Sequence, residues 1–182
     1  MSSSATTSQS LGPTPKTITG GCLCSSLRYE IMFPPSHDFV ENTCVCQCTQ
    51  CRKQTGGFFY ASYSVPTKSL KWTSGTADKL KKYHATDNIS RGFCGNCGSF
   101  LFWYPDGRNM ISLAIGSVDP LYLFGEGAEE TGNGAVPKEG FGRVLCSGLG
   151  NIAFCSNDIK GITDEMPLLL RGKRYQGDSS DP

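Results

Sequence analysis

The sequence predicts a single, mainly β domain with polar tails, and three observations support this. Its 182 residues correspond to roughly 1.2 domains at about 150 residues per domain. Short apolar runs, rich in β-branched and aromatic residues, alternate with a period close to two, which is typical of half-buried strands. Helical periodicity is weak along the whole chain, so the pattern does not favour a helix bundle.

The expected strands are separated by Pro, Gly, Asn and Asp residues that favour turns. They cover Ser26–Phe33, Phe58–Val65, Phe100–Tyr104 and Met110–Ile115. Short helices are expected only at Thr49–Thr55 and Thr76–Lys82. Two later apolar islands, Val144–Leu149 and Ile152–Phe154, can return the chain to the sheet.

The domain is expected to span residues 17–170. Residues 1–16 are rich in Ser and Thr and contain Pro13 and Pro15, and residues 171–182 are polar, so both ends are expected to be disordered tails. The glycine-rich segment Gly125–Gly142 predicts a long surface excursion.

Charge excludes some classes of partner. Seventeen basic and sixteen acidic residues leave a net charge of +1, so no overall field attracts nucleic acid or an anionic membrane. No run approaches the roughly 20 apolar residues of a membrane span, and residues 1–16 lack the pattern of a signal or transit peptide. The expected location is the cytoplasm, and any partner must be recognised locally, while the oligomeric state is not indicated.

Ten cysteines in 182 residues are fewer than the roughly 8–10% of a disulfide scaffold, and eight of them are clustered. In a reducing compartment such clusters favour metal binding or catalysis over disulfides. The Cys94–Cys97 turn, flanked by Gly95 and Gly98, can present two thiolates to one ion. Its natural complement is Cys22 and Cys24, with Gly20 and Gly21 offering a bend. The four predict a closed, structural zinc site.

A second zinc is expected at Cys46, Cys48 and Cys51, which are also the predicted catalytic residues. Three protein ligands leave a fourth position for substrate. Three thiolates around a divalent ion carry a net charge of −1, which Arg52 and Lys53 can offset; the alternative is that both are solvated charges on a helix surface. Cys44 is either a fourth ligand, a resolving thiol or, as slightly favoured, a buried small residue.

Other residues have weaker patterns. Gln54, Thr55 and Gly56 can donate hydrogen bonds to a bound tripeptide or carbonyl oxygen, or serve only in a helix cap or turn. Candidates for proton transfer are Asp119, Asp164 and Glu165. Cys146 and Cys155 are expected in the core, and His37 and His84 are not expected to be general bases. Six aromatic residues are expected mainly in the core, although at least one can face the site: Phe58, Phe59, Tyr60, Phe102, Trp103 and Tyr104.

Four motifs resemble the glutathione-dependent formaldehyde-activating enzyme family, also called the centromere protein V family. They are Gly20–Cys24, Cys46–Gly56, Phe93–Phe102 and Ile115–Pro120, within residues 17–120. The segment Ser156–Pro167 also resembles the ending of fungal members. The chain departs from the family pattern at Ser25, where glycine is usual, at Gln47, where histidine is frequent, and in the Gly125–Gly142 excursion.

The resemblance implies a β-tent fold of coiled antiparallel sheets, a structural zinc and an exchangeable catalytic zinc. It also implies a zinc-dependent carbon-sulfur lyase that forms or cleaves S-hydroxymethylglutathione, with glutathione as a co-substrate. Two alternatives stay open. One is a tailoring enzyme of fungal secondary metabolism that performs elimination, cyclisation or isomerisation on a carbonyl or polyketide substrate. The other is a non-enzymatic, zinc-stabilised interaction module.

Overall fold

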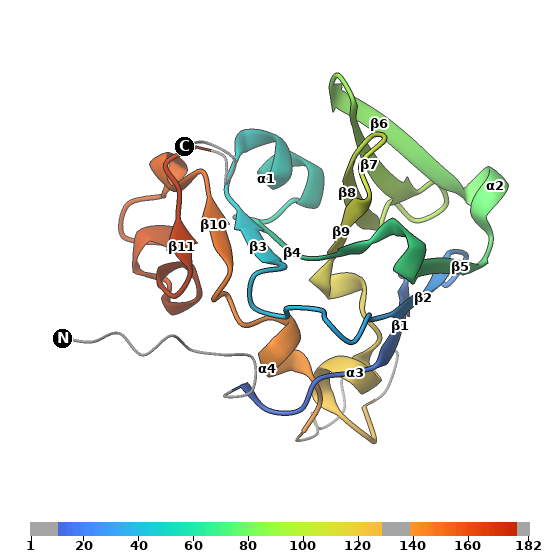
Figure 1. Cartoon of the computed structure of the whole chain (residues 1–182). Helices are drawn as coiled ribbons and strands as arrows, with labels where there is room; N and C mark the ends of the chain where they lie inside the picture. Colours follow the sequence, from blue (N-terminus) through green and yellow to red (C-terminus); the bar gives the residue numbers. More distant parts are fainter. Residues whose placement is uncertain (1–10, 129–138, 178–182) are drawn as a thin grey trace.

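The computed structural model describes residues 11–128 and 139–177. The central part of the predicted Gly125–Gly142 excursion, residues 129–138, lies outside the described residues, as do the outer parts of both predicted tails. The chain forms one mainly β domain with two open sheets, as the sequence predicts (Figure 1).

The smaller sheet has three antiparallel strands in the order β1-β2-β5. They are β1 (Thr17–Gly21), β2 (Arg28–Met32) and β5 (Leu70–Ser74). In β1 and β2, buried and partly exposed residues alternate, so one face of each strand packs on the core.

The larger sheet has eight strands in the order β11-β10-β3-β4-β9-β8-β7-β6. In chain order they are β3 (Thr43–Cys46), β4 (Tyr60–Pro66), β6 (Leu80–Thr86), β7 (Ile89–Cys94), β8 (Phe100–Pro105), β9 (Met110–Ala114), β10 (Asn151–Ala153) and β11 (Lys173–Arg174). Its pairs are antiparallel except that β10 runs parallel to both β3 and β11. The expected antiparallel sheets are thus present, and this edge adds two parallel pairs because the chain returns there through a long connection.

Helices are few and short, as expected. They are α1 (Thr49–Thr55), α2 (Thr76–Lys79), α3 (Pro120–Phe124) and α4 (Gly142–Leu145), with 3-10 turns η2 (Thr67–Ser69), η3 (Ile115–Ser117), η4 (Cys155–Asn157), η5 (Thr163–Glu165) and η6 (Pro167–Leu170). The predicted helix at Thr49–Thr55 is confirmed with the same bounds. The helix predicted to continue to Lys82 ends at Lys79, because β6 begins at Leu80 and pairs with β7. Val144 lies in α4 and not in a strand, whereas Ile152 does rejoin the sheet.

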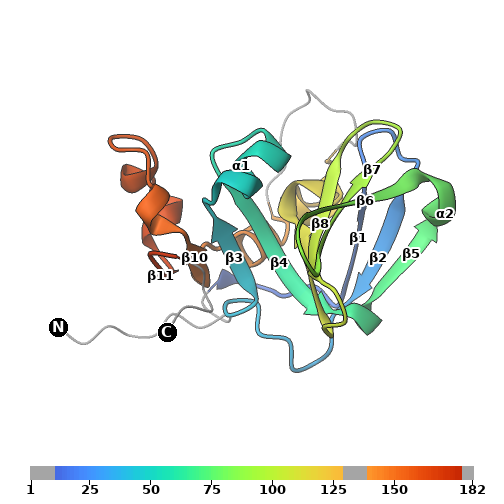
Figure 2. The ribbon, with the colours of Figure 1, turned by 90° about the horizontal axis from the view of Figure 1, so that it is seen from above.

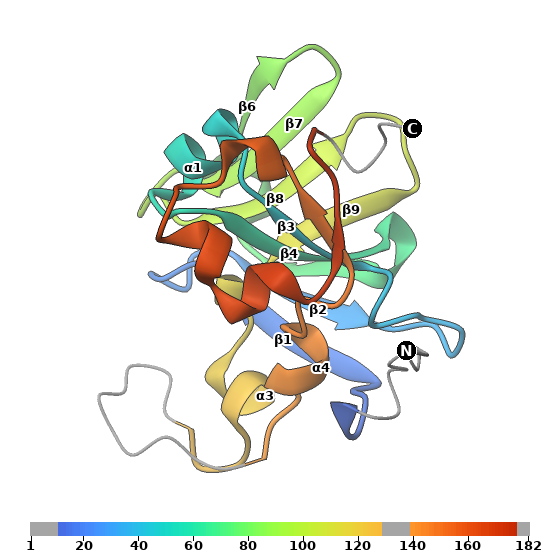
Figure 3. The ribbon, with the colours of Figure 1, turned by 90° about the vertical axis from the view of Figure 1, so that its left-hand side faces the viewer.

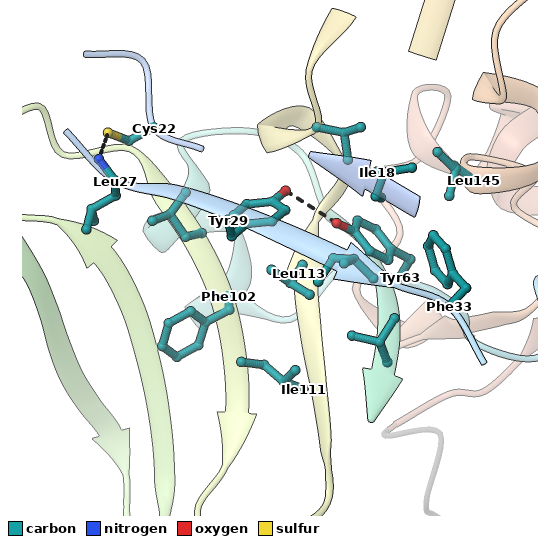
Figure 4. Packing of buried hydrophobic residues seen from close by; sticks show 14 of the residues in the cluster. Ile18, Cys22, Leu27, Tyr29, Phe33, Tyr63, Phe102, Ile111, Leu113 and Leu145 are labelled. Atoms are coloured by element: carbon teal, nitrogen blue, oxygen red, sulfur yellow. Dashed lines mark hydrogen bonds between the residues drawn. The ribbon is translucent and has the colours of Figure 1, made fainter. Parts of the chain in front are cut away.

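The main core lies between the two sheets (Figure 4). Ile18, Tyr29 and Tyr63 are almost fully buried, and the two tyrosine hydroxyls lie 3.3 Å apart and point toward one another. The Tyr29 hydroxyl also lies 2.8 Å from Ser117 Oγ, so these buried polar groups are paired. Phe102 is buried in the same core, as the sequence predicts.

A smaller apolar cluster attaches the C-terminal segment to β3. It consists of Val45, Ile152, Cys155 and Leu169. Figure 2 shows this segment, in orange to red, at the opposite end of the molecule from β1, β2 and β5. At the other end of the chain, Leu11 packs against the main core and Pro15 is buried. The boundary expected at residue 17 stays a prediction. No helix among the described residues is long and apolar enough to cross a membrane.

Candidate metal centres

Cys22, Cys24, Cys94 and Cys97 form the first cluster, and their sulfur atoms all lie within 4.8 Å of one another. The Cys22 and Cys24 sulfurs are 3.6 Å apart, and those of Cys24 and Cys94 are 3.8 Å apart. The pairs come from the β1–β2 turn and from the turn between β7 and β8, about seventy residues apart in the sequence. The grouping inferred from spacing is therefore what the fold produces.

Two tight turns bring these sulfurs together. Ser25 has a φ of 58°, which lies in the left-handed region that glycine adopts most easily. Gly98 has a φ of 78° and donates its backbone N–H to the carbonyl of Cys94. The expected bend at Gly20 and Gly21 is wrong: both lie in β1, where a Cβ on Gly20 would lie 2.4 Å from the Tyr29 hydroxyl.

Hydrogen bonds at this cluster favour thiolates at its exposed edge. Contacts with Ser26 Oγ at 3.2 Å and with the Asn96 side-chain amide at 3.2 Å lower the pKa of Cys24 to about 5. Burial raises the pKa of Cys22 to about 12 in the metal-free cluster. Four cysteines with this separation match the ligand set of a closed zinc site.

Cys46, Cys48 and Cys51 form the second cluster, again with all sulfur atoms within 4.8 Å of one another. Cys46 ends β3, and Cys48 is the N-cap of α1, where its Sγ accepts a hydrogen bond from the backbone N–H of Cys51 at 3.3 Å. Cys46 and Cys48 are two positions apart, and Cys48 and Cys51 are three apart. The end of the strand and the first turn of the helix bring their three sulfur atoms together. Cys44 is not in this group, so the group offers three ligands.

The pKa values of the three thiols are shifted in different directions. Hydrogen bonds from Cys46 and Cys51 lower the pKa of Cys48 well below its ordinary value, and the backbone N–H groups of Cys51 and Gln50 add to this. The same interaction with Cys48 raises the pKa of Cys46. Cys48, which is partly exposed, is therefore the preferred thiolate of the group.

Arg91 on β7 lies against this cluster from the other side. Its Nη1 is 3.9 Å from Cys51 Sγ, and its Nη2 donates to Gln50 Oε1 at 2.6 Å. Gln50 also donates to Thr86 Oγ1 at 3.1 Å. These contacts join α1 to the β6–β7 hairpin, which lies beside it in Figure 3.

A cleft of about 350 Å³ opens beside the cluster. It is lined by Gln50, Lys53, Gln54, Tyr83, Ala85 and Arg91. Arg91 belongs both to its wall and to the surroundings of Cys51, so the cleft is next to the three-cysteine group. A second cavity, of about 280 Å³ and lined by Leu11, Arg143 and Cys146 among others, includes no cysteine of either cluster.

The predicted ligand contacts Gln54, Thr55 and Gly56 divide in the structure. Gln54 lines the cleft. Thr55 Oγ1 donates to the carbonyl of Cys51 at 2.8 Å, and Gly56 ends α1 with a φ of 70°, so these two have the helix-ending role that the sequence left open. Arg52 donates to the carbonyls of Phe58 and Asn157, while Lys53 is exposed in the cleft.

Other candidates lie in structural contacts. Asp119 accepts hydrogen bonds from Thr19 and Arg28, so it holds β1 and β2 rather than facing the three cysteines. Asp164 and Glu165 lie in η5. His84 contacts Asp106 and Ser90 at 3.0 Å each, and His37 packs against Phe33 and Phe39. Cys155 is buried and Cys146 partly buried.

Among the aromatic residues, Tyr60 lies opposite Cys46 in the β3–β4 pair. It is buried, its hydroxyl donates to the carbonyl of Ser112 at 2.8 Å, and its ring packs on Phe100. Burial, followed by the nearby charges of Cys51 and Cys44, raises its pKa well above the ordinary value. Phe59 packs on the C-terminal apolar cluster, whereas Phe58 is exposed.

Sequence reasoning missed Arg91 and Asp158. Gln47, between two of the cysteines, donates to Asp158 Oδ1 at 2.5 Å. Neither residue stands near the Cys46–Cys51 motif in the sequence. The sequence before Cys94 gives no signal for Arg91, because Ser90, Arg91 and Gly92 interrupt its apolar residues and nothing there indicates that the charge is buried.

The donor sets fit the metals that thiolates prefer. Four and three clustered sulfurs, which no carboxylate oxygen or histidine nitrogen joins among the described residues, match zinc rather than magnesium or calcium. The fold and the two groups define a mainly β protein with one closed and one three-ligand candidate metal centre.

A sequence profile described as glutathione-dependent formaldehyde-activating enzyme matches residues 17–130. The match covers more than half of the chain, and the chain belongs to this family. No curated protein matches it. Among solved structures, this chain is similar to a Rhodobacter sphaeroides protein, with 19% sequence identity and a TM-score of 0.46. The match covers 66% of this chain and 98% of the other.

Proposed function

We propose that this protein is a zinc-dependent carbon-sulfur lyase acting on a glutathione-type thiol adduct, most simply S-hydroxymethylglutathione. The single observation that carries the proposal is the three-cysteine group beside an open cleft. A closed site of four cysteines has no place for a substrate, whereas a site of three does.

The reaction adds a thiol to an aldehyde, and it is reversible. The sulfur lone pair forms a bond to the carbonyl carbon, the carbon-oxygen π pair moves to oxygen, and that oxygen ends with the proton that the thiol has lost. Cleavage breaks the carbon-sulfur bond and returns the proton to sulfur, so no oxidant or reductant is needed.

The protein's residues prepare and place the reactants. Cys46, Cys48 and Cys51 would hold the ion, and the N-cap geometry of Cys48 keeps its sulfur in place. Zinc held by these residues would supply Lewis acidity that favours the thiolate form of a substrate thiol. Lys53 and Gln54 line the cleft, where they can contact the carboxylate and amide groups of a glutathione-type substrate.

A second candidate is the tailoring enzyme that uses the same site on a larger carbonyl compound. One observation favours it: residues beyond the family match border the site, because Asn157 and Asp158 contact Arg52 and Gln47. This C-terminal border is a part of the chain in which substrate preference can differ from that of shorter members of the family.

The test is native mass spectrometry of protein purified without added metal, with and without millimolar glutathione. Two zinc ions per chain support the proposal if glutathione either binds to one of them or removes it from the protein. S-Methylglutathione is the matched control, because it keeps both carboxylates but lacks the thiol and should leave both zinc ions unchanged. Two zinc ions indifferent to glutathione favour the tailoring enzyme, and one inert zinc favours a structural module.

Activity provides the second arm. The protein should increase the rate at which formaldehyde and glutathione reach equilibrium, and Cys48→Ser should abolish the increase while the chain stays folded. An unchanged rate in the presence of the zinc-loaded protein would contradict the lyase.

A further inference from the structure

Arg91 is a buried cation without a carboxylate partner. Its side chain comes from the middle of β7 and the residue is only 3% exposed. Among residues 11–128 and 139–177 it forms no ion pair with an Asp or Glu. Its hydrogen-bond contacts are with the neutral oxygen of Gln50 and the sulfur of Cys51, and its Nε is buried without a hydrogen-bond partner among the described residues.

This burial needs an opposite charge. A guanidinium stays protonated in proteins, and burying a charge is costly unless it is paired. Gln50 provides one hydrogen bond but no charge. The sulfur of Cys51 is the contact that can become anionic, and it is so when the cluster holds a metal, since the ligand form of cysteine is the thiolate.

Charge counting shows what the pair achieves. Three thiolates and a divalent ion sum to −1, and the guanidinium brings the group to zero. We propose that Arg91 is the buried counter-charge of the Cys46–Cys48–Cys51 centre, which allows this centre to retain its ion and to accept an additional anionic thiolate. The inference rests on the proposed function, because it takes the same three-cysteine centre as the reactive site.

The two cations that follow the motif in the sequence are not placed for this role. The guanidinium of Arg52 donates hydrogen bonds to the carbonyls of Phe58 and Asn157. Lys53 is exposed in the cleft, where solvent screens its charge. The offset expected from these two residues comes instead from a different strand.

Zinc affinity tests the proposal without a thiol or an aldehyde. The full-length chain would be loaded with zinc and titrated with a chromophoric chelator, and the zinc that disappears in Cys48→Ser identifies the three-cysteine centre. Arg91→Met should weaken this zinc by about 10–100-fold, the range for partners of metal ligands, and leave the four-cysteine site unchanged. Arg91→Lys should retain most of the affinity, because it keeps the charge.

Lys53→Met is the matched control, since it removes a cation from the same cleft and should not change zinc affinity. Unchanged affinity in Arg91→Met overturns the proposal, and so does equal weakening in Arg91→Met and Arg91→Lys, which indicates shape rather than charge. If Arg91→Met does not fold, Gln50→Met replaces it: freeing the guanidinium should weaken the same zinc by a smaller factor, and no change overturns the proposal.

Glutathione binding gives the second readout. In cobalt-substituted protein, the sulfur-to-metal absorption should respond to glutathione in the native chain and require more glutathione in Arg91→Met. If both proteins need the same glutathione concentration for this response, Arg91 does not help the centre to accept an additional thiolate. A native protein that ignores glutathione but shows the zinc-affinity loss in Arg91→Met would count against the proposed lyase and leave Arg91 as the counter-charge.

Discussion

Gln47 donates its side-chain amide to Asp158, across 111 positions in the sequence, at a distance of 2.5 Å. Gln47 lies between two cysteines of the three-cysteine centre and is fully buried. Asp158 in turn pairs with Arg174 at the edge of the larger sheet. The C-terminal segment is therefore attached by a polar contact directly to the loop that carries the candidate ligands.

Replacing Asp158 with Ala should destabilise the protein by about 1–3 kcal/mol, because a buried amide loses its acceptor. The effect should include weaker zinc retention at the three-cysteine centre. Urea unfolding and zinc content measure the two parts. Lys173→Ala on β11 is the control: its ion pair with Glu41 is exposed and should be worth only about 0–1 kcal/mol. Equal effects of the two substitutions would contradict the role of Asp158.

The two cysteine clusters should respond differently to loss of one ligand. Cys97→Ser removes a ligand from the site that joins the β1–β2 turn to the β7–β8 turn, so it should unfold the chain or lower its Tm strongly. Cys48→Ser should remove one zinc and the activity with a much smaller change in Tm. Circular dichroism, thermal melts and zinc content distinguish them. Full zinc content with an unchanged Tm in Cys97→Ser would be incompatible with a structural metal.

Local pattern was sufficient for much of the fold and for both cysteine groups. Alternation predicted the positions of β2, β4, β8 and β9, and Thr49–Thr55 was one of two short helices expected in a chain with weak helical periodicity. Closeness in sequence explains each local cysteine group, and the four-cysteine set followed from matching two local pairs that each lacked two ligands.

The parts that were missed depend on tertiary contacts. The exposed, lysine-rich β6 has no apolar alternation, and it is a strand because β7 pairs with it. The partners of the reactive cluster, Arg91 and Asp158, come from elements about 40 and 107 positions beyond Cys51. Nothing in the local sequence specifies which distant strand supplies a charge, so only the neighbouring Arg52 and Lys53 were considered as cations near the cluster.

A glycine on β7 tests the packing that supports Arg91. A Cβ on Gly92 would lie 2.1 Å from the Phe102 ring on the neighbouring strand. Gly92→Ala should therefore displace a buried ring and cost about 1–3 kcal/mol. Gly116→Ala is the control, since no atom lies within 4 Å of its added Cβ. Chemical denaturation measures both, and a Gly92→Ala protein as stable as Gly116→Ala would show that the ring moves freely.

Acid release of zinc tests the hydrogen bonds at the four-cysteine cluster. The pKa of Cys24 is lowered to about 5 from 9.0 by Ser26 and Asn96, so these donors favour the thiolate, and the stabilisation is present above pH 9 and lost as the pH falls through 5. Asn96→Leu removes one donor and raises this pKa. Protons then compete with zinc at a higher pH, so the midpoint of zinc release should move toward neutral pH. Zinc retained after equilibration between pH 7.5 and pH 4 measures the midpoint, and the three-cysteine centre of the same variant is the internal control. A midpoint that does not move, or that moves to lower pH, would show that the Asn96 amide does not stabilise the Cys24 thiolate.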